Sequence, residues 1–290
     1  MSESIQRWRL VFARDEEARF LSHLDAVKLW ERAFRRGSIP VATSEGFSPR
    51  PRVVFAAPLP LGMLAEHELA DLFLAERLTS HDLRARLAAG MPRGYRVVDL
   101  HDEWVGAPAL APQLVAADYR LILLGVESEA AEEGIRTLLA AERLPRERRR
   151  EDKVVGYDLR PLLTDLRVHD LHDLGDVPLG MPEVRTGAAL TAGAQVGATA
   201  SAVPAAAQVC STPSVVPGAE PNQPAVARGV EMWMRLRHSQ NEGSGRAEEV
   251  VAALADALSA STFAGSVEQS PIELVHPVRE RLWLTGELAT

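Results

Sequence analysis

The alternation of apolar and polar residues over the first hundred positions predicts a sheet with two helices. Residues 7–15, 51–59, 66–76 and 95–104 have the pattern of strands, and residues 22–36 and 79–90 have that of helices. Ser22, followed by Asp25, forms a capping box at the start of the first helix, and Gly37 ends it. The order βαββαβ predicts a ferredoxin-like sheet with both helices on one face.

A second, looser copy of this order follows. Its predicted strands are residues 117–126, 153–163, 230–238 and 278–288, and its predicted helices are residues 127–142 and 245–260. The sequence therefore predicts an α+β protein with two tandem ferredoxin-like (βαββαβ) units and antiparallel sheets. The first unit is expected in residues 1–105 and the second in residues 115–290.

The second copy is interrupted at about residues 187–228, a stretch rich in Ala, Gly, Pro, Ser and Val that has neither a helical nor a strand period. Too few large apolar side chains are present there to offset the entropy lost when the backbone becomes ordered. We therefore expect a flexible insertion without chemistry of its own.

Charge and cysteine content limit the possible functions. The 290 residues have a formal net charge of -8, which disfavours a protein that coats nucleic acid with its whole surface but allows a local basic patch. Cys210 is the only cysteine, so this chain alone can build neither a disulfide framework nor an iron-sulfur cluster. The densest histidine cluster, HDLHD at 169–173, is a weak metal candidate, and we expect no metal or other cofactor. No apolar run is long enough for a membrane span, and we expect a cytoplasmic protein without a membrane partner.

The first helix combines an apolar face with a basic stripe. The stripe consists of Lys28, Arg32, Arg35 and Arg36, spaced i, i+4, i+7 and i+8. A solvated helix face is the ordinary explanation for such a run, and Glu31 could neutralise part of it through Arg35. The loop that follows favours a binding role.

This loop reads SEGFSPRPR and lies at residues 44–52. Gly46 permits a turn, prolines stiffen the exit, and an aromatic residue stands between polar neighbours. Its candidate binding residues for an anion, RNA or a protein partner are Ser44, Glu45, Phe47, Arg50 and Arg52. Arginines beside an exposed aromatic ring suit phosphate and RNA.

Two further groups are secondary candidates. His23 and Asp25 could take part in acid–base chemistry, although a role in starting the helix is the stronger interpretation. In KVVGYDLRPLL, residues 153–163, Lys153, Asp158 and Arg160 lie in or beside a predicted strand end. The alternative for the last two is a structural Asp–Arg pair that holds the turn. No catalytic residue is assigned.

The segments LSHLD, RAFRR, SEGFSPRPRVVFAAPLPLG and KVVGYDLRP resemble the uncharacterised radical-SAM-associated domain family. In that family the domain occurs alone or fused behind a B12-binding radical SAM enzyme, and its own activity is not established. This chain resembles the stand-alone form. It lacks a CxxxCxxC motif, so the resemblance implies a helper that works with a radical SAM enzyme as its partner.

The basic helix and loop, taken with this resemblance, favour an accessory RNA-binding or substrate-presenting protein in tRNA or rRNA modification. Two alternatives remain open. The chain could be an RNA-modifying or RNA-processing enzyme that uses Asp25 or Asp158, or a protein–protein adaptor whose arginines meet acidic residues of the radical SAM enzyme.

Overall fold

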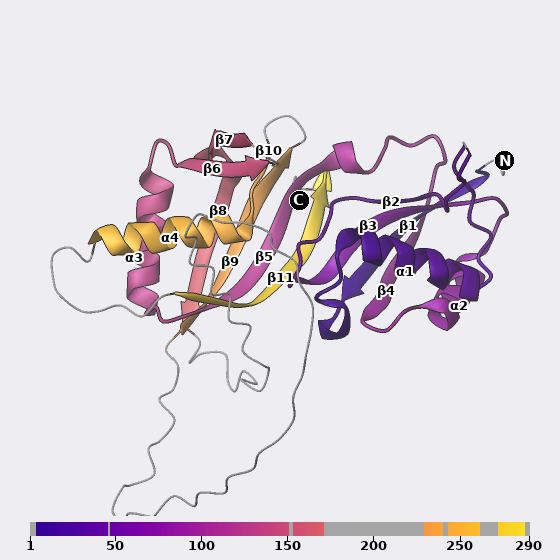
Figure 1. Ribbon diagram of the computed structural model, residues 1–290, viewed down its shortest axis with the longest axis horizontal. Helices are drawn as coiled ribbons and strands as arrows, with labels where there is room; N and C mark the ends of the chain where they lie inside the picture. The colour runs from indigo at the N-terminus through magenta and orange to yellow at the C-terminus, as the bar shows by residue number, and fades with distance from the viewer. Residues whose placement is uncertain are drawn as a thin grey trace, which may run out of the picture. The chain divides into compact units, whose positions relative to one another are not determined.

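The computed structural model describes residues 4–45, 47–150, 153–170, 229–239, 243–261 and 272–287. These residues belong to one compact unit of the chain. They form a mixed α/β structure in which nine strands make one mostly antiparallel sheet, two more make a separate hairpin, and four α-helices are present (Figure 1). The expected combination of helices with a mainly antiparallel sheet is therefore confirmed.

The first part of the sheet has the order β4-β1-β3-β2, and all neighbours are antiparallel. Its elements are β1 (Gln6–Arg14), α1 (His23–Arg36), β2 (Val53–Phe55), β3 (Leu64–Leu74), α2 (Ser80–Gly90) and β4 (Tyr95–Glu103), with a short 3-10 turn, η1 (Glu16–Ala18), before α1. Trp30 and Phe34 of α1 and Leu83 of α2 are buried in one apolar cluster with Leu10 and Leu72 of the sheet. Both helices therefore cover the same face of these strands.

The ends of α1 agree with the sequence pattern. The hydroxyl of Ser22 accepts a hydrogen bond from the backbone N–H of Asp25 at 3.2 Å, which satisfies one of the free donors at the helix start. At the other end, the backbone N–H of Gly37 donates to the carbonyl of Ala33 at 2.9 Å. Thr79 caps α2 in the same way as Ser22 caps α1, through the N–H of Asp82 at 3.1 Å.

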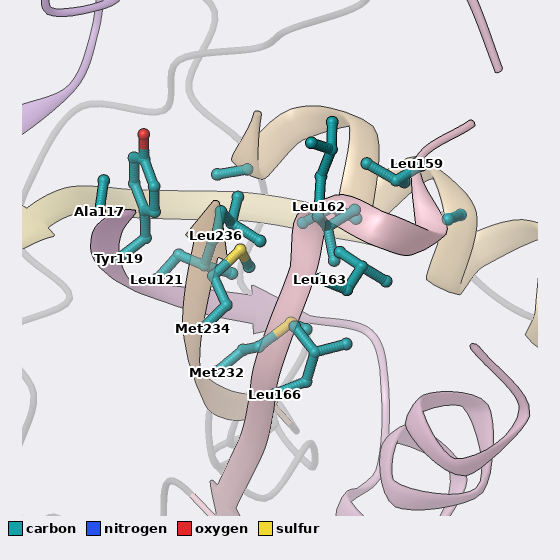
Figure 2. Packing of buried hydrophobic residues seen from close by; sticks show 14 of the residues in the cluster. Ala117, Tyr119, Leu121, Leu159, Leu162, Leu163, Leu166, Met232, Met234 and Leu236 are labelled. Atoms are coloured by element: carbon teal, nitrogen blue, oxygen red, sulfur yellow. The ribbon is translucent and has the colours of Figure 1, made fainter. Parts of the chain in front are cut away.

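The second part of the sheet has the order β8-β9-β5-β11, again with antiparallel neighbours. Its elements are η2 (Ala111–Gln113), β5 (Leu114–Leu124), α3 (Ser128–Ala140), η3 (Arg160–Leu162), β8 (Leu163–Asp170), β9 (Gly229–Ser239), β10 (Gly243–Ser244), α4 (Ala247–Ser261) and β11 (Glu273–Leu284). Figure 2 shows Tyr119, Leu121, Leu166 and Met232 among the side chains gathered on one face of these strands. Buried residues of α3 and α4 complete this cluster, so both helices cover the same face of these four strands. The opposite face, called the open face below, has no helix over it among the described residues.

The two parts share one sheet because β11 pairs with β3 in parallel, with Arg279 opposite Ala65. At this junction Arg279 forms a buried ion pair with Glu68 of β3. The strand that closes the second part therefore also lies beside the first part.

One expected strand is placed differently. Residues 153–163 were predicted as a strand of the second unit, but β7 (Lys153–Asp158) pairs only with β6 (Pro145–Arg150) in a separate two-stranded sheet. The strand that pairs with β9 in the large sheet is β8. The strand itself is confirmed over Lys153–Asp158, and only its place in the sheet differs from the prediction. Val154 and Val155 have the apolar character of a sheet strand, yet these residues are 62% and 47% exposed on the hairpin.

The predicted flexible insertion at about 187–228 lies outside the described residues. Among the helices that are described, none is both long enough and apolar enough to span a membrane.

Candidate functional site

The basic stripe of α1 lies on the side of the helix that faces away from the sheet. Lys28, Arg32, Arg35 and Arg36 are all exposed, whereas Trp30, Ala33 and Phe34 are buried. Lys28 lies 3.7 Å from Asp25, and Arg36 donates to the carbonyl of Gly90 at 2.8 Å. Within the described part of the chain, Arg32 and Arg35 have no hydrogen-bond or ion-pair partner for their side chains. These two guanidinium groups are therefore available to a ligand.

The loop after α1 is closed at its base and exposed at its tip. The N–H of Ser44 donates to the carbonyl of Arg50 at 2.8 Å, the N–H of Arg50 donates to the hydroxyl of Ser44 at 3.1 Å, and a β-bridge joins Thr43 to Pro51. Phe47 is fully exposed, and Glu45 and Arg50 are exposed beside it. An exposed phenyl ring on a closed turn is suited to stacking or to anchoring a partner.

Arg52 belongs to a different surface. Its guanidinium lies 4.0 Å from the centre of the Phe73 ring and donates to the hydroxyl of Ser4 at 3.0 Å. Phe73 alternates along β3 with Leu72 and Leu74, which pack against the helices, so its ring is on the opposite face of the sheet. The structure therefore does not bring Arg52 together with the α1 stripe.

Several arginines in the first part of the sheet are committed to the fold. The buried guanidinium of Arg7 bonds to Asp71 and to the carbonyls of Ala107 and Pro108, at 2.6 and 2.9 Å for the carbonyls. Arg14 is 2% exposed and bonds to backbone carbonyls, including that of Pro60 at 2.6 Å. Arg32, Arg35 and Arg50 differ from these arginines because no described group neutralises or hydrogen-bonds their side chains.

His23 and Asp25 are used at the start of α1. The carboxylate of Asp25 accepts a hydrogen bond from the Ser22 hydroxyl at 2.7 Å. The ring of His23 lies edge-on to Phe55, with 5.7 Å between ring centres. These contacts agree with the structural interpretation and form no acid–base pair between the two residues.

Asp158 and Arg160 both hold the end of the β6–β7 hairpin, but they do not pair with each other. Asp158 accepts hydrogen bonds from the N–H groups of Leu144 at 2.8 Å and Arg160 at 3.0 Å, and these bonds hold its pKa below the usual range. The Arg160 guanidinium donates instead to the carbonyls of Leu139 and Leu163, at 2.9 and 3.3 Å. Asp158 therefore does not pair with Arg160; its ion-pair partner is Arg143, at 3.6 Å, and the contacts of Arg160 are to the backbone.

Lys153 is the first residue of the hairpin's second strand, β7. The same hairpin is attached to α4 through Glu249. This carboxylate accepts hydrogen bonds from Arg148, at 3.0 and 3.1 Å, and from the hydroxyl of Tyr157. Burial, together with the bond to Glu249, raises the pKa of Tyr157 to about 12.

An open hollow of about 740 Å³ lies beside the hairpin, lined by Arg143, Pro145, Arg146, Glu147, Gly156, Tyr157 and Asp158. Tyr157 and Asp158 already have structural partners, so neither of these two side chains is free to react in this hollow.

A second surface was not found by the sequence reasoning. On the open face of β8, β9, β5 and β11, Arg167 and Arg235 lie over the ring of Trp233, with 5.2 and 5.4 Å from guanidinium carbon to ring centre. Arg235 and Arg281 lie over Trp283 at 4.7 and 4.2 Å. We call these five residues the Trp–Arg face. The alternation of buried Met232, Met234 and Leu236 with Trp233 and Arg235 could have identified it.

The described residues contain no group of three or more His, Cys, Asp or Glu side chains that could hold a metal ion. Of the HDLHD segment, only His169 and Asp170 fall within the described ranges, and residues 171–173 fall outside them.

A family model described as "Uncharacterized protein conserved in bacteria (DUF2344)" matches residues 7–195, which include α1, the exposed loop and the β6–β7 hairpin. No curated protein matches the chain.

Proposed function

The chain belongs to the DUF2344 family of uncharacterised bacterial proteins, and we propose that it is an RNA-binding accessory protein that presents an RNA substrate to a radical SAM enzyme. The RNA is a tRNA or rRNA that the enzyme modifies. The stripe of α1 and the loop at residues 44–50 form the contact surface in this proposal.

The observation that supports it most is the exposure of Arg32 and Arg35 without a described partner. Two like charges one helical turn apart repel each other, and here no described carboxylate relieves that repulsion. A bound anion would relieve it, and planar guanidinium groups suit phosphate oxygens particularly well. Phe47, fully exposed at the tip of its loop, adds a ring on which a base can stack.

The proposed architecture suits this role. We interpret the orders β4-β1-β3-β2 and β11-β5-β9-β8 as two ferredoxin-like units, each with two helices on one face. Modules of this outline often bind RNA. The residues named above carry the proposal.

The radical SAM enzyme enters through the resemblance of LSHLD, SEGFSPRPR and KVVGYDLRP to domains that accompany such enzymes. The proposal includes a division of labour between the two proteins, and it leaves Asp25 and Asp158 to their structural contacts. In this proposal the partner supplies the cluster chemistry and this chain supplies the RNA contact.

The test measures RNA affinity as a function of salt for the wild-type protein and for the double variant Arg32→Gln and Arg35→Gln. We expect wild-type affinity for a bulk tRNA preparation to fall steeply with salt, and the variant to bind more weakly with a shallower dependence. Arg93→Gln with Arg136→Gln is a charge-matched control on other exposed positions.

Equal loss of affinity in the control variant would show that total charge alone matters, and would contradict a specific surface. For the partner, affinity capture of the tagged protein under anaerobic conditions should retain an iron–sulfur protein. Wild-type protein that retains neither RNA nor such a partner would refute the proposal.

A further inference from the structure

Resting on the proposed RNA binding, we propose that the Trp–Arg face (Arg167, Trp233, Arg235, Trp283 and Arg281) is a second RNA contact, and that it takes the unpaired bases of a single strand. The α1 stripe would then hold phosphates of either duplex or single-stranded RNA, whereas the Trp–Arg face would distinguish single-stranded RNA from a duplex.

The side chains of the Trp–Arg face come from three strands of the second part. The backbone register places Arg167 of β8 opposite Trp233 of β9, and Arg281 of β11 opposite Asp118 of β5. Because β9 and β5 are also paired, all these side chains stand on one pleated surface. The guanidinium groups and indole rings alternate, with Arg235 lying over both Trp233 and Trp283.

Hydrogen bonds from the indole N–H groups fix the orientation of both rings. The indole N–H of Trp233 donates to Glu280 at 3.1 Å, and that of Trp283 donates to Asp118 at 2.8 Å. Asp118 also accepts two bonds from Arg235, at 2.7 and 2.9 Å. The rings are only partly buried, so flat surface remains accessible while their orientation is set. Such preorganisation reduces the entropy lost on binding.

Charge is distributed unevenly on this side of the sheet. Three carboxylates, those of Glu66, Glu231 and Glu280, gather around Arg120, at 2.9, 3.4 and 2.6 Å. The Trp–Arg face contains three arginines, and two aspartates lie beside them. Asp118 accepts from Arg235, and Asp165 accepts from Arg167. In the described structure Arg281 contacts the Trp283 ring and has no carboxylate partner. Glu280 also accepts the hydrogen bond from the indole N–H of Trp233, so acidic side chains border that ring, whereas Arg281 beside Trp283 supplies an exposed cation that no described carboxylate pairs.

This chemistry selects a single strand over the alternatives. Bases stack on indole rings and on guanidinium planes, and a four-stranded sheet with aromatic side chains on its open face is a common platform for unpaired bases. The bases of a duplex are stacked on one another and cannot reach the rings. An acidic protein segment could pair with Arg281 but would gain less from two fixed indole rings.

The experiment compares two probes, a single-stranded oligouridine of about 12 nucleotides and an RNA duplex of the same length. Trp283→Leu and, separately, Arg281→Gln should weaken oligouridine binding by about tenfold and change duplex binding by less than about twofold. Ultraviolet crosslinking of bound oligouridine should mark peptides from β9 and β11. Trp104→Leu, which removes another exposed tryptophan, is the control and should leave both affinities unchanged.

Arg281→Gln keeps the test decisive if Trp283→Leu fails to fold, because Arg281 is exposed and has only a ring contact. Normal oligouridine binding by folded variants, while Arg32→Gln with Arg35→Gln lowers binding of both probes, would overturn this inference and leave the proposed function intact. No RNA binding by the wild-type protein would overturn both. Crosslinks confined to α1 and the loop would also refute the second contact.

Discussion

Arg279 of β11 donates two hydrogen bonds to Glu68 of β3, from Nε to Oε1 at 2.6 Å and from Nη2 to Oε2 at 2.5 Å. The two residues are 211 positions apart, and both side chains are 3% exposed. They lie where β11 and β3 run in parallel. A buried bidentate pair holds the closing strand of the second part against the first.

Removing one partner of this pair should destabilise the protein strongly. Glu68→Ala leaves the guanidinium of Arg279 buried without its counter-charge, and we expect a loss of about 3–5 kcal/mol in the free energy of unfolding. Urea denaturation measures this. Glu68→Leu combined with Arg279→Met should recover most of the loss, because the remaining charge is removed with its partner. A single variant within about 1 kcal/mol of wild type would show that the pair does not hold the junction.

The contact between α1 and α2 should not tolerate a side chain at Gly90. A Cβ atom there would lie 2.3 Å from the carbonyl oxygen of Ala33 and 2.9 Å from the backbone nitrogen of Gly37. Gly90→Ala should therefore lower stability by about 1–3 kcal/mol, as overpacking does. Gly156→Ala is the matched control, since a Cβ at that position meets nothing within 4 Å. Equal melting temperatures for the two variants would contradict the close approach of the helices.

The three tyrosines should ionise later in the folded protein than in the unfolded chain. Burial raises the pKa of Tyr95, Tyr119 and Tyr157, in the last case to about 12. Each raised pKa gives stability that is complete below the ordinary value of about 10 and is lost as pH rises through the folded-state value.

Ultraviolet absorbance of tyrosinate checks this prediction. The native protein should show little tyrosinate at pH 10, whereas the protein in denaturant should be about half ionised there. Tyr157→Phe should remove the part of the native transition near pH 12. A native titration centred at pH 10 would show that these hydroxyls are freely solvated.

Changing Arg35 and Arg50 should separate binding from stability. Both side chains are exposed without a described partner, so Arg35→Gln with Arg50→Gln should alter the free energy of unfolding by less than about 1 kcal/mol. If each arginine contacts one phosphate, the slope of log affinity against log salt should become shallower by about 1.4 for a single-stranded RNA. A collapse in melting temperature with an unchanged slope would make these arginines structural.

The sequence by itself determined the local features of the fold. The period of α1 decided which face is buried, because an amphipathic helix can bury only its apolar side, and Ser22 and Gly37 marked its ends through local hydrogen bonds. The exposure of Arg32 and Arg35 follows from the same period. These properties depend on neighbours within a few positions, and such neighbours can be read from the sequence.

Only the tertiary structure decided which strands pair and which arginines remain available. Strand β7 has the apolar residues of a sheet strand but pairs in the separate hairpin, because pairing depends on distant partners. Arg279 and Arg281 are two positions apart, yet one is buried against Glu68 and the other lies over Trp283, since a register irregularity in β11 falls between them. Sequence separation gives no measure of such contacts, and they exist only once the strands are assembled.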